Sequence, residues 1–530
     1  MLTKRQLLQY IGSAAGAAGV YRTLAALGML GVSSLTGCSS PSAVSQSIGD
    51  GKRIVILGAG IAGLVAAYEL DRMGYDCTIL EATARAGGRS LTVRSGDMIE
   101  EFGGAQRVNF DDKAYLYANM GPARIPYHHR AILDYCKAFE VDLEVFTNDN
   151  RAAFFQAPGS FDGRAVVARQ LHTDQRGYIA ELLAKAVNRN ALDQELTAED
   201  KERLLSMLKS FGDLQDDYLY VDSGRAGYQG EHVNKGLFAD AMPVEPLGLR
   251  QLLGFDEADL WWALRFSHGV NQNPTLLQPV GGMDMIVEAF KAQVGHLIRY
   301  ESIVEDISNQ PGGGVRIGYS HRGTVMEALD ADFAICTIPT TVLRDIDNNF
   351  SETTRAAIES RTYDAAVKIA FQARRRFWEE DHFIYGGISW TNQNDIQQIW
   401  YPANGYHRPK GIVMGAYIFG EDPFDRDFAL EFAKKSYSQR LEHALDSGER
   451  IHRGYRDELE VDTGVSRAWS EVPFQKGSWP SAPVPIAALE VPDGAVYFAG
   501  DHTSALSGWQ EGSAQSALAV VEAINERVVY

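Results

Sequence analysis

The stretch RIVILGAGIAGLVAAYEL, residues 53–70, decides the fold of this chain. Its apolar start is typical of a strand that is buried on both faces of a parallel sheet. Three glycines follow at the spacing GxGxxG. Gly58 allows a tight turn, Gly60 lets the backbone approach a pyrophosphate, and Gly63 lets a helix pack closely against the strand. Because the first amides of that helix would face the phosphates, the stretch predicts a dinucleotide-binding unit.

A second predicted strand supports this interpretation. Residues 77–80 end at Glu81, about 20 residues beyond the glycines, where a carboxylate reaches the ribose hydroxyls of a bound dinucleotide. A GxGxxG motif alone is weak, but the strand before it, the helix after it and the acid together favour a Rossmann-like α/β domain. They do not separate a nicotinamide from a flavin cofactor.

Two further motifs separate these cofactors. RAGGR, residues 85–89, follows the acid, and YFAGDHTSALSGWQEGSAQSA, residues 497–517, lies near the end of the chain. With the glycine turn, they resemble the ADP-binding and flavin-end motifs of the flavin-containing amine oxidase family. The resemblance implies FAD held without a covalent bond, because residues 468–478, the region where monoamine oxidases carry their flavin-linked cysteine, contain no cysteine.

The resemblance also assigns cofactor contacts. Arg89 would lie against the diphosphate, a role that suits an always-charged guanidinium with paired donors. The backbone at Val304 would pair with the adenine, and Asp501 would accept from the ribityl or phosphate side. The full set of implied contacts comprises Gly58, Gly60, Ile61, Ala62, Gly63, Glu81, Ala82, Gly88, Arg89, Gly104, Ala105, Gln106, Arg107, Val304, Gly500, Asp501, Trp509, Gln510 and Glu511.

The expected architecture is a Rossmann-like FAD-binding domain of the glutathione-reductase type, interrupted twice. Its segments are residues 51–125, 272–344 and 480–530. A helical domain over residues 126–271 and a mixed-sheet substrate-binding domain over residues 345–479 would form the interruptions.

Local patterns indicate helices in the first interruption. Residues 127–139 follow a proline and show apolar residues at intervals of four, which predicts an amphipathic helix. Thr197 and Asp200 could form a capping box for a helix that ends at Gly212. Farther on, Trp261, Trp262 and Phe266 could line a substrate pocket, although aromatic residues in helices more often belong to a core.

Lys368 is the predicted catalytic residue. Residues 366–372 read as a strand with Val367, Ile369 and Phe371 on one face and Lys368 on the other. On this pattern alone, Lys368 would be a solvated edge residue. The match VKIAF to the amine oxidase family implies instead that this lysine reaches the flavin N5 through a water molecule.

The segment YANMGPARIP, residues 117–126, resembles the segment of L-amino-acid oxidases whose arginine binds the substrate carboxylate. Arg124 would fill that role, because a guanidinium offers two parallel donors to two oxygens, and the following proline favours an extended approach. The resemblance adds Tyr401 as a second carboxylate ligand, the carbonyl of Gly508 for the substrate ammonium, and Trp509 as a wall beside the flavin. The alternatives are a surface ion pair for Arg124 and a core position for Tyr401.

These assignments predict an FAD-dependent L-amino-acid oxidase, which forms a 2-oxo acid, ammonia and hydrogen peroxide from an amino acid and dioxygen. An amine or polyamine oxidase and an amino-acid 2-monooxygenase remain alternatives. In a non-catalytic binding protein on the same fold, Lys368 and the motif at Trp509 would have no role. A membrane quinone could replace dioxygen as electron acceptor, and the sequence leaves a homodimer open.

Composition excludes some classes of partner. The chain has 530 residues, of which 45% are hydrophobic and 22% charged, so it can bury a large core. Its net charge of −19 disfavours nucleic acid as a partner. Cys77, Cys136 and Cys336 are expected to be free buried thiols, and the histidines and cysteines show no metal-ligand spacing.

Residues 1–50 are expected to be an export segment and linker. TKRQLL, residues 3–8, resembles a twin-arginine signal in which lysine replaces one arginine. LTGC, residues 35–38, resembles a bacterial lipoprotein box, which would make Cys38 the lipidated first residue of an exported protein tethered to a membrane. Arg22 interrupts the apolar stretch, so no span reaches the roughly 20 residues that a membrane helix needs.

Overall fold

A five-stranded parallel sheet, in the order β12-β2-β1-β16-β23, carries the glycine turn. Three separate parts of the chain supply its strands, which are β1 (Arg53–Leu57), β2 (Asp76–Leu80), β12 (Ile298–Arg299), β16 (Phe333–Cys336) and β23 (Val496–Phe498). Four of the five residues of β1 are buried, as a strand covered on both faces requires. The predicted Rossmann-like α/β class is confirmed.

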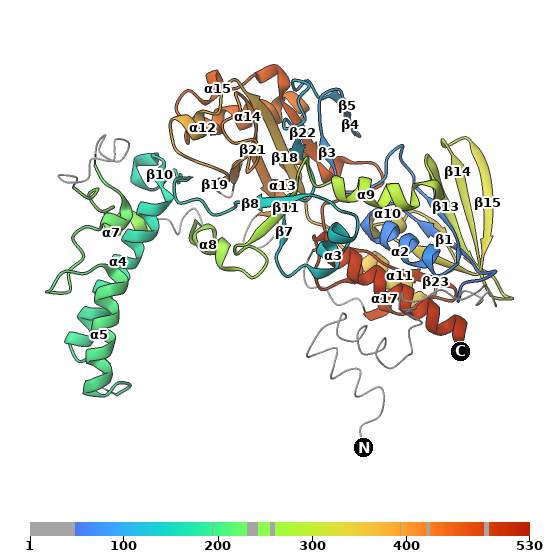
Figure 1. The fold of residues 1–530 in the computed structure, drawn as a ribbon, viewed down its shortest axis with the longest axis horizontal. Coiled ribbons are helices and arrows are strands. Elements are labelled where there is room, and N and C mark those ends of the chain that lie inside the picture. The colour runs from blue at the N-terminus through green and yellow to red at the C-terminus, as the bar shows by residue number, and fades with distance from the viewer. Residues whose placement is uncertain are drawn as a thin grey trace, which may run out of the picture. The chain divides into compact units, whose positions relative to one another are not determined.

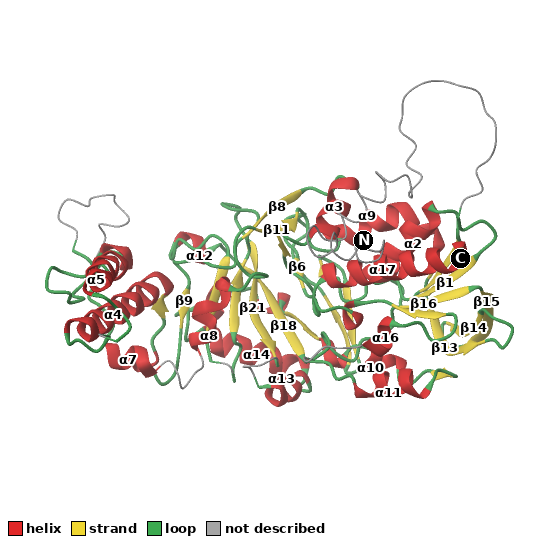
Figure 2. Cartoon of the chain, turned by 90° about the horizontal axis from the view of Figure 1, so that it is seen from below, coloured by secondary structure: helices red, strands yellow, loops and turns green. Residues whose placement is uncertain are grey.

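Helices cover both faces of this sheet. On one side, α2 (Ile61–Arg72) contacts both α9 (Met285–Val294) and α17 (Gln510–Val529), and Figure 2 shows them gathered above β1 and β16. On the other side lie α10 (Thr340–Leu343), α11 (Glu352–Ser360) and α16 (Ala487–Glu490). A second sheet, in the order β15-β14-β13-β17, adjoins the five-stranded sheet. Its strands are β13 (Ser302–Asn309), β14 (Val315–His321), β15 (Val325–Ala331) and β17 (Asp347–Asn348).

A seven-stranded sheet, in the order β10-β9-β19-β20-β21-β18-β22, forms the floor of the substrate-binding part. Its strands are β9 (Phe154–Phe155), β10 (Val166–Val167), β18 (Ala366–Ala373), β19 (Gly387–Trp390), β20 (Gln398–Tyr401), β21 (Gly411–Phe419) and β22 (Val465–Ala468). All eight residues of β18 are buried, and α13 (Arg426–Ala433) and α14 (Tyr437–Gly448) pack against the face that carries Val367, Ile369 and Phe371. Because β18 lies between β21 and β22, Lys368 on the other face is buried and is not an edge residue.

The segment predicted as a helical domain, residues 126–271, differs from that prediction in part. Its early residues form α3 (Arg130–Ala138), β8 (Leu143–Phe146), β9 and β10, and the last two strands belong to the seven-stranded sheet. The long helices are α4 (Ala168–Asn188) and α5 (Ala198–Gly212), drawn in green in Figure 1. The predicted capping box is confirmed, since Thr197 and Asp200 satisfy each other's backbone amides, and α5 ends at Gly212.

The remaining elements are short. They are β3 (Thr92–Val93), β4 (Met98–Glu101), β5 (Gly104–Arg107), β6 (Ala118–Asn119), β7 (Ile125–Pro126), β11 (Leu276–Pro279), α7 (Leu249–Leu253), α8 (Leu260–Arg265), α12 (Phe377–Glu380) and α15 (Tyr455–Glu458). Strand β11, which follows the segment of residues 126–271, pairs antiparallel with both β7 and β8 near the start of that segment.

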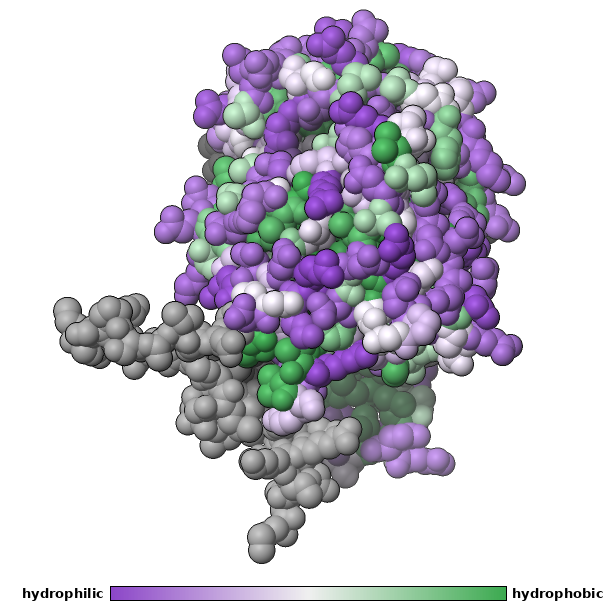
Figure 3. Space-filling view, turned by 90° about the vertical axis from the view of Figure 1, so that its right-hand side faces the viewer, coloured by the Kyte–Doolittle hydropathy of each residue, from purple (hydrophilic) through white to green (hydrophobic). Residues whose placement is uncertain are grey.

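This computed structural model describes residues 48–192, 194–229, 242–254, 260–392, 394–420, 425–481 and 487–530. The export and lipidation prediction, including Cys38, falls outside these residues. Within them, none of the helices is long and apolar enough to cross a membrane. Hydrophilic residues cover most of the face shown in Figure 3, as the net charge leads one to expect. The three predicted free thiols are buried and unpaired.

Candidate active site

A cavity of about 460 Å³ lies at the carboxyl ends of β1 and β2 and extends to the face of the seven-stranded sheet that carries Lys368. Such edges of parallel sheets are where open α/β folds bind their ligands. The wall contains fifteen of the predicted site residues, which are Gly58, Gly60, Ile61, Ala62, Glu81, Ala82, Gly88, Arg89, Val304, Lys368, Gly500, Asp501, Gly508, Trp509 and Gln510.

The glycine turn at one end of the cavity has the predicted division of roles. A Cβ added to Gly60 would meet no atom within 4 Å, so the backbone there is open to a ligand. A Cβ added to Gly63 would lie 2.0 Å from the carbonyl oxygen of Gly58, so only glycine lets α2 pack this closely. The carboxylate of Glu81 accepts hydrogen bonds of 2.9 Å from the amides of Ala59 and Thr83, which fixes the turn.

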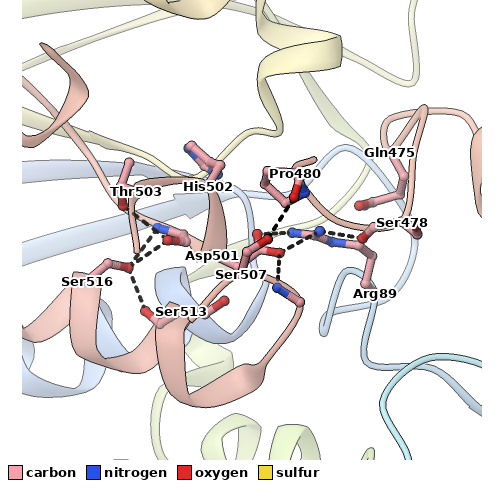
Figure 4. A network of polar contacts seen from close by, with 12 residues as sticks. Arg89, Gln475, Ser478, Pro480, Asp501, His502, Thr503, Ser507, Ser513 and Ser516 are labelled. Carbon is pink, nitrogen blue, oxygen red and sulfur yellow. Dashed lines mark hydrogen bonds and ion pairs between the residues drawn. The ribbon is translucent and has the colours of Figure 1, made fainter. Parts of the chain in front are cut away.

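An ion pair joins the two cofactor motifs across the cavity. The Arg89 guanidinium donates to both carboxylate oxygens of Asp501, at 2.9 and 2.5 Å, and to the carbonyl of Ser478 at 2.6 Å (Figure 4). Asp501 also accepts from the amide of Gly508 at 3.3 Å. The pair is bidentate and nearly buried, with 4% of the Asp501 side chain exposed, so it holds the RAGGR loop against the C-terminal motif.

Two groups of predicted cofactor contacts need correction. Gly104, Ala105, Gln106 and Arg107 form β5, an edge hairpin strand paired with β4, and none of them reaches the cavity wall. The chain passes the cavity at Met120, Gly121 and Pro122 instead, which the sequence reasoning missed.

Glu511 also lies outside the cavity wall. Its buried carboxylate accepts from the amides of Ala131 and Ile132 at 3.1 and 2.9 Å, so it satisfies the first turn of α3. The neighbouring Gln510 does line the cavity and donates to the hydroxyl of Ser90 at 2.9 Å.

Lys368 is 3% exposed and enters the cavity from β18. Its ammonium donates to the carbonyls of Asn119, at 3.1 Å, and Gly121, at 2.6 Å. The ring centroids of Tyr417 and Trp400 lie 4.7 and 5.2 Å from its Nζ. Burial, reinforced by the charge of Arg124, lowers the pKa of Lys368 to about 7, so this lysine exchanges its proton near neutral pH.

Arg124 lies just before β7 in an aromatic enclosure that borders the cavity at Trp509, and Arg124 itself is not among the wall residues. Its guanidinium carbon is 5.2, 5.4 and 5.7 Å from the ring centroids of Trp400, Trp509 and Phe266. Two of its nitrogens donate to one oxygen, the side-chain Oε1 of Gln272, at 3.0 and 2.5 Å. Burial lowers the pKa of Arg124 to about 10, and no carboxylate among the described residues lies within 4.0 Å of it.

Tyr401 occupies the wrong face of the sheet for the predicted role. Its hydroxyl is bonded to Ser389 at 2.7 Å and to His452 at 2.5 Å, within the core between the sheet and its helices. Successive side chains of a strand point to opposite faces, so the preceding Trp400 is the residue that contacts Arg124. Tyr417, opposite Lys368 in the neighbouring strand, supplies the cavity's tyrosine.

Sequence signals existed for some of the missed residues. Once Lys368 is placed on the cavity face, strand alternation and antiparallel pairing predict Tyr417 beside it. Gln272 carries no such signal, because it reaches Arg124 only through the pairing of β7 with β11. Phe266, an open candidate for the pocket, lies against Arg124, whereas Trp262 packs 5.6 Å from Trp390 in the aromatic layer behind it.

The residues of the cavity fit FAD. The open backbone at Gly60 and the acid Glu81 suit the ADP half. The wall then runs on to Trp509 and Lys368, which leaves room for the second half of a dinucleotide beyond the sheet edge. No cysteine is among the described wall residues, so the cavity offers no thiol for a covalent link. The cavity therefore suits FAD held without a covalent bond.

Comparison with known proteins gives one consistent result. A family model described as flavin containing amine oxidoreductase matches residues 61–525. A putative L-amino-acid oxidase, YobN, of Bacillus subtilis (strain 168) is 29% identical over 502 residues, covering 89% of this chain and 95% of that protein. The flavin-dependent L-tryptophan oxidase RebO of Lentzea aerocolonigenes is 28% identical, covering 89% and 98%.

Among solved structures, a cyclohexylamine oxidase from Brevibacterium oxydans IH-35A superposes with a TM-score of 0.59 at 16% identity, covering 90% of this chain and 100% of that one. A putrescine oxidase bound to putrescine gives a TM-score of 0.57 at 15% identity, covering 90% and 99%. These likenesses show the fold. With the family match over most of its length and a cavity built for FAD, the chain belongs to the flavin-containing amine oxidoreductases.

Proposed function

We propose that this protein is an L-amino-acid oxidase. It converts an L-amino acid, dioxygen and water into a 2-oxo acid, ammonia and hydrogen peroxide. The observation that carries the proposal is Arg124, an arginine inside the aromatic enclosure whose hydrogen-bond acceptor, the side chain of Gln272, is a neutral amide. A carboxylate is the substrate group that such a cation selects.

The environment of Arg124 favours an anion over a neutral ligand. Burial lowers its pKa, which means that the charged guanidinium is poorly solvated. The oxygen of Gln272 occupies the Nε and one terminal nitrogen, so the remaining N–H groups are available for a ligand. A substrate carboxylate would form charge-assisted hydrogen bonds there, in a medium of low dielectric where they are strong. Tyr417 lies near enough to Arg124 to interact with its charge and can donate from its hydroxyl.

The same enclosure favours a neutral substrate amine. Arg124 and Lys368 place two cationic groups beside the binding position, and a neighbouring positive charge lowers the pKa of an ammonium. An amino acid bound through its carboxylate would therefore lose an ammonium proton more readily, and a neutral amine is what removal of a hydride from Cα requires. FAD, when bound, supplies the two-electron oxidation and returns the electrons to dioxygen.

The names of two relatives, an L-amino-acid oxidase and an L-tryptophan oxidase, support this choice over the amine oxidases seen among the structures. A direct test uses matched pairs of substrates that differ only in the carboxylate, such as L-phenylalanine and 2-phenylethylamine. Peroxide and 2-oxo acid formation is measured with the flavin-loaded protein under air. We expect kcat/KM for the amino acid to exceed that for the amine by at least roughly 100-fold.

Other products would point to other enzymes. Oxidation of the amines alone would make the protein an amine oxidase. An amide with carbon dioxide as product would make it an amino-acid 2-monooxygenase. Flavin reduction by amino acids without peroxide, coupled to reduction of an added quinone, would change the electron acceptor but not the substrate. A purified protein without flavin and without activity after FAD addition would point to a binding protein.

We further propose that the protein is exported and lipid-anchored at Cys38. The motifs TKRQLL and LTGC in residues 1–50 support this. Cell fractionation with mass analysis of the mature N-terminus tests both steps. A Cys38→Ser variant should remain soluble if the tether is a lipid on this cysteine. A protein found inside the cell with residues 1–37 still attached would contradict export.

A further inference from the structure

A second cleft lies outside the flavin site, beside helix α4. It has a volume of about 250 Å³ and is formed by α4, the end of α5 and the short turn η2 (Gly224–Ala226). Four arginines line it, which are Arg151, Arg169, Arg176 and Arg225. We propose that this cleft binds a phosphate-bearing anion.

The arginines that α4 contributes to the cleft lie on one face of the helix. Arg169, Thr173 and Arg176 are spaced by four and three residues, which places them on one face of the helix. Arg169 and Arg176 are seven residues apart, about two helical turns, so their guanidinium groups flank Thr173 on that face. The chain as a whole carries a net charge of −19, so a cluster of four arginines around one small cleft is a basic site in an acidic protein.

The arginines of α4 have no carboxylate partner within 4.0 Å among the described residues. Arg169 is partly buried, and burial lowers its pKa. Its Nε faces the backbone of η2, since a Cβ on Gly227 would lie 3.0 Å away. Arg176 extends over the ring of Phe211 at 5.9 Å. Both guanidinium groups therefore retain free donors.

The other two arginines complete the cleft from different elements. Arg151 is anchored to α4 because its carbonyl accepts from the amide of Arg169 at 2.9 Å, and its side chain makes one long contact of 3.4 Å with Asp149. Arg225 donates to the carbonyls of Ser210 and Phe211, each at 3.1 Å, so it sits at the C-terminal end of α5.

One carboxylate, Asp213, lies in the cleft wall, 4.0 Å from Arg225, and it also accepts from the hydroxyl of Ser223. His172, buried beside the arginines, is held neutral because burial and the charges of Arg151 and Arg176 lower its pKa to about 4. The four arginines are offset by Asp213 in the wall and by Asp149, the partner of Arg151, which leaves two positive charges for a ligand with two negative charges to balance.

Phosphate is the anion that this geometry favours. A guanidinium binds a phosphate through paired parallel N–H groups, and the hydroxyl of Thr173 offers a further donor. The cleft is larger than an inorganic phosphate needs and can hold a phosphate with a small organic group attached. Free phosphate and a phosphate monoester share this chemistry, so the experiment must separate them.

The test titrates the full-length, flavin-loaded protein by calorimetry with inorganic phosphate, ribose 5-phosphate and citrate. We expect both phosphates to bind, with affinity that falls as sodium chloride is raised. Tighter binding of ribose 5-phosphate would identify a phosphate monoester as the occupant, and equal binding would identify free phosphate. Binding of citrate alone, or of none of the three, would overturn the proposal.

Variants locate the site. Arg169→Gln and Arg176→Gln should each weaken phosphate binding by roughly tenfold or more, since each removes charge-assisted hydrogen bonds. Arg203→Gln is the matched control, because Arg203 lies on α5, loses the same charge, and pairs with Glu199 at 2.5 Å away from the cleft. Equal weakening in the control would refute the site. The visible flavin spectrum checks that each variant is folded.

A measurement on the unaltered protein does not depend on folding of variants. Phenylglyoxal modifies accessible arginines, and peptide mass spectrometry reports each site. Inorganic phosphate should slow modification of Arg169 and Arg176 and leave Arg203 unaffected. Equal rates at all three positions, with and without phosphate, would contradict the proposal.

Discussion

Replacing Arg124 with glutamine tests the carboxylate assignment directly. The variant keeps a polar side chain of similar length but removes the cation that lies within 5.7 Å of three aromatic rings. Because the amino acid would then bring an unpaired carboxylate into a desolvated enclosure, its binding should suffer far more than that of an amine. Gly60, Arg89 and Asp501, the wall residues expected to bind the flavin, are untouched, so flavin content should not change.

The size of the loss follows from the cost of leaving one buried charge without its partner. That cost is about 3 to 5 kcal/mol for a fully buried pair, which corresponds to a loss of roughly 100-fold to several thousand-fold in kcat/KM. Arg124 retains some solvent exposure, so the lower end of this range is the better expectation. We expect the greater part of the effect in KM, because the interaction is made in both the bound substrate and the transition state.

The assay measures kcat/KM for L-phenylalanine and for 2-phenylethylamine by peroxide release. Arg94→Gln is a matched control, since it removes the same charge in the same part of the chain, but Arg94 already has a carboxylate partner, Asp284, at 2.8 Å. Unchanged kinetics with the amino acid in Arg124→Gln would refute the assignment. So would an equal loss for both substrates, because only the carboxylate distinguishes them.

Four further outcomes follow from the structure. Burial lowers the pKa of Lys368 from 10.5 to about 7, so above pH 7 the unfolded chain holds a proton that the folded chain has released. This lysine should make stability rise with pH between about 7 and 9, below the range in which the buried thiols, whose pKa burial raises from 9 to about 12, oppose the rise. Lys368→Met should remove this contribution in thermal unfolding. Gly63→Ala should yield protein without flavin absorbance, because its Cβ would lie 2.0 Å from a carbonyl oxygen, whereas Gly103→Ala, with no atom within 4 Å, should retain it. Tyr417→Phe should raise KM for amino acids. Tyr401→Phe should leave KM unchanged and lower the melting temperature, because its hydroxyl contacts, worth about 1 kcal/mol, are lost. The reverse pattern would restore Tyr401 to the substrate site. Acid precipitation should release the flavin into the supernatant, and flavin that stays with the pellet would contradict a non-covalent link.

Local sequence determined the glycine turn of the cofactor site. The roles of Gly58, Gly60 and Gly63 depend on a turn between adjacent elements, so their spacing along the chain specifies their spacing in space. The faces of β18 likewise follow from alternation, which placed Lys368 opposite Val367 before any partner strand was known.

Tertiary structure alone decided which residues meet in the substrate half. Tyr401 and Trp400 differ by one position, and only the pairing of β20 with β21 settles that Trp400 faces Arg124. Glu511 carries the charge expected near a cofactor, yet the approach of α3 turns it into a cap for that helix. The contact of Gln272 with Arg124, like the cleft that joins Arg151 to α4, depends on segments far apart in the chain. Sequence spacing fixes distances within a turn, whereas distances across such long separations are set by packing.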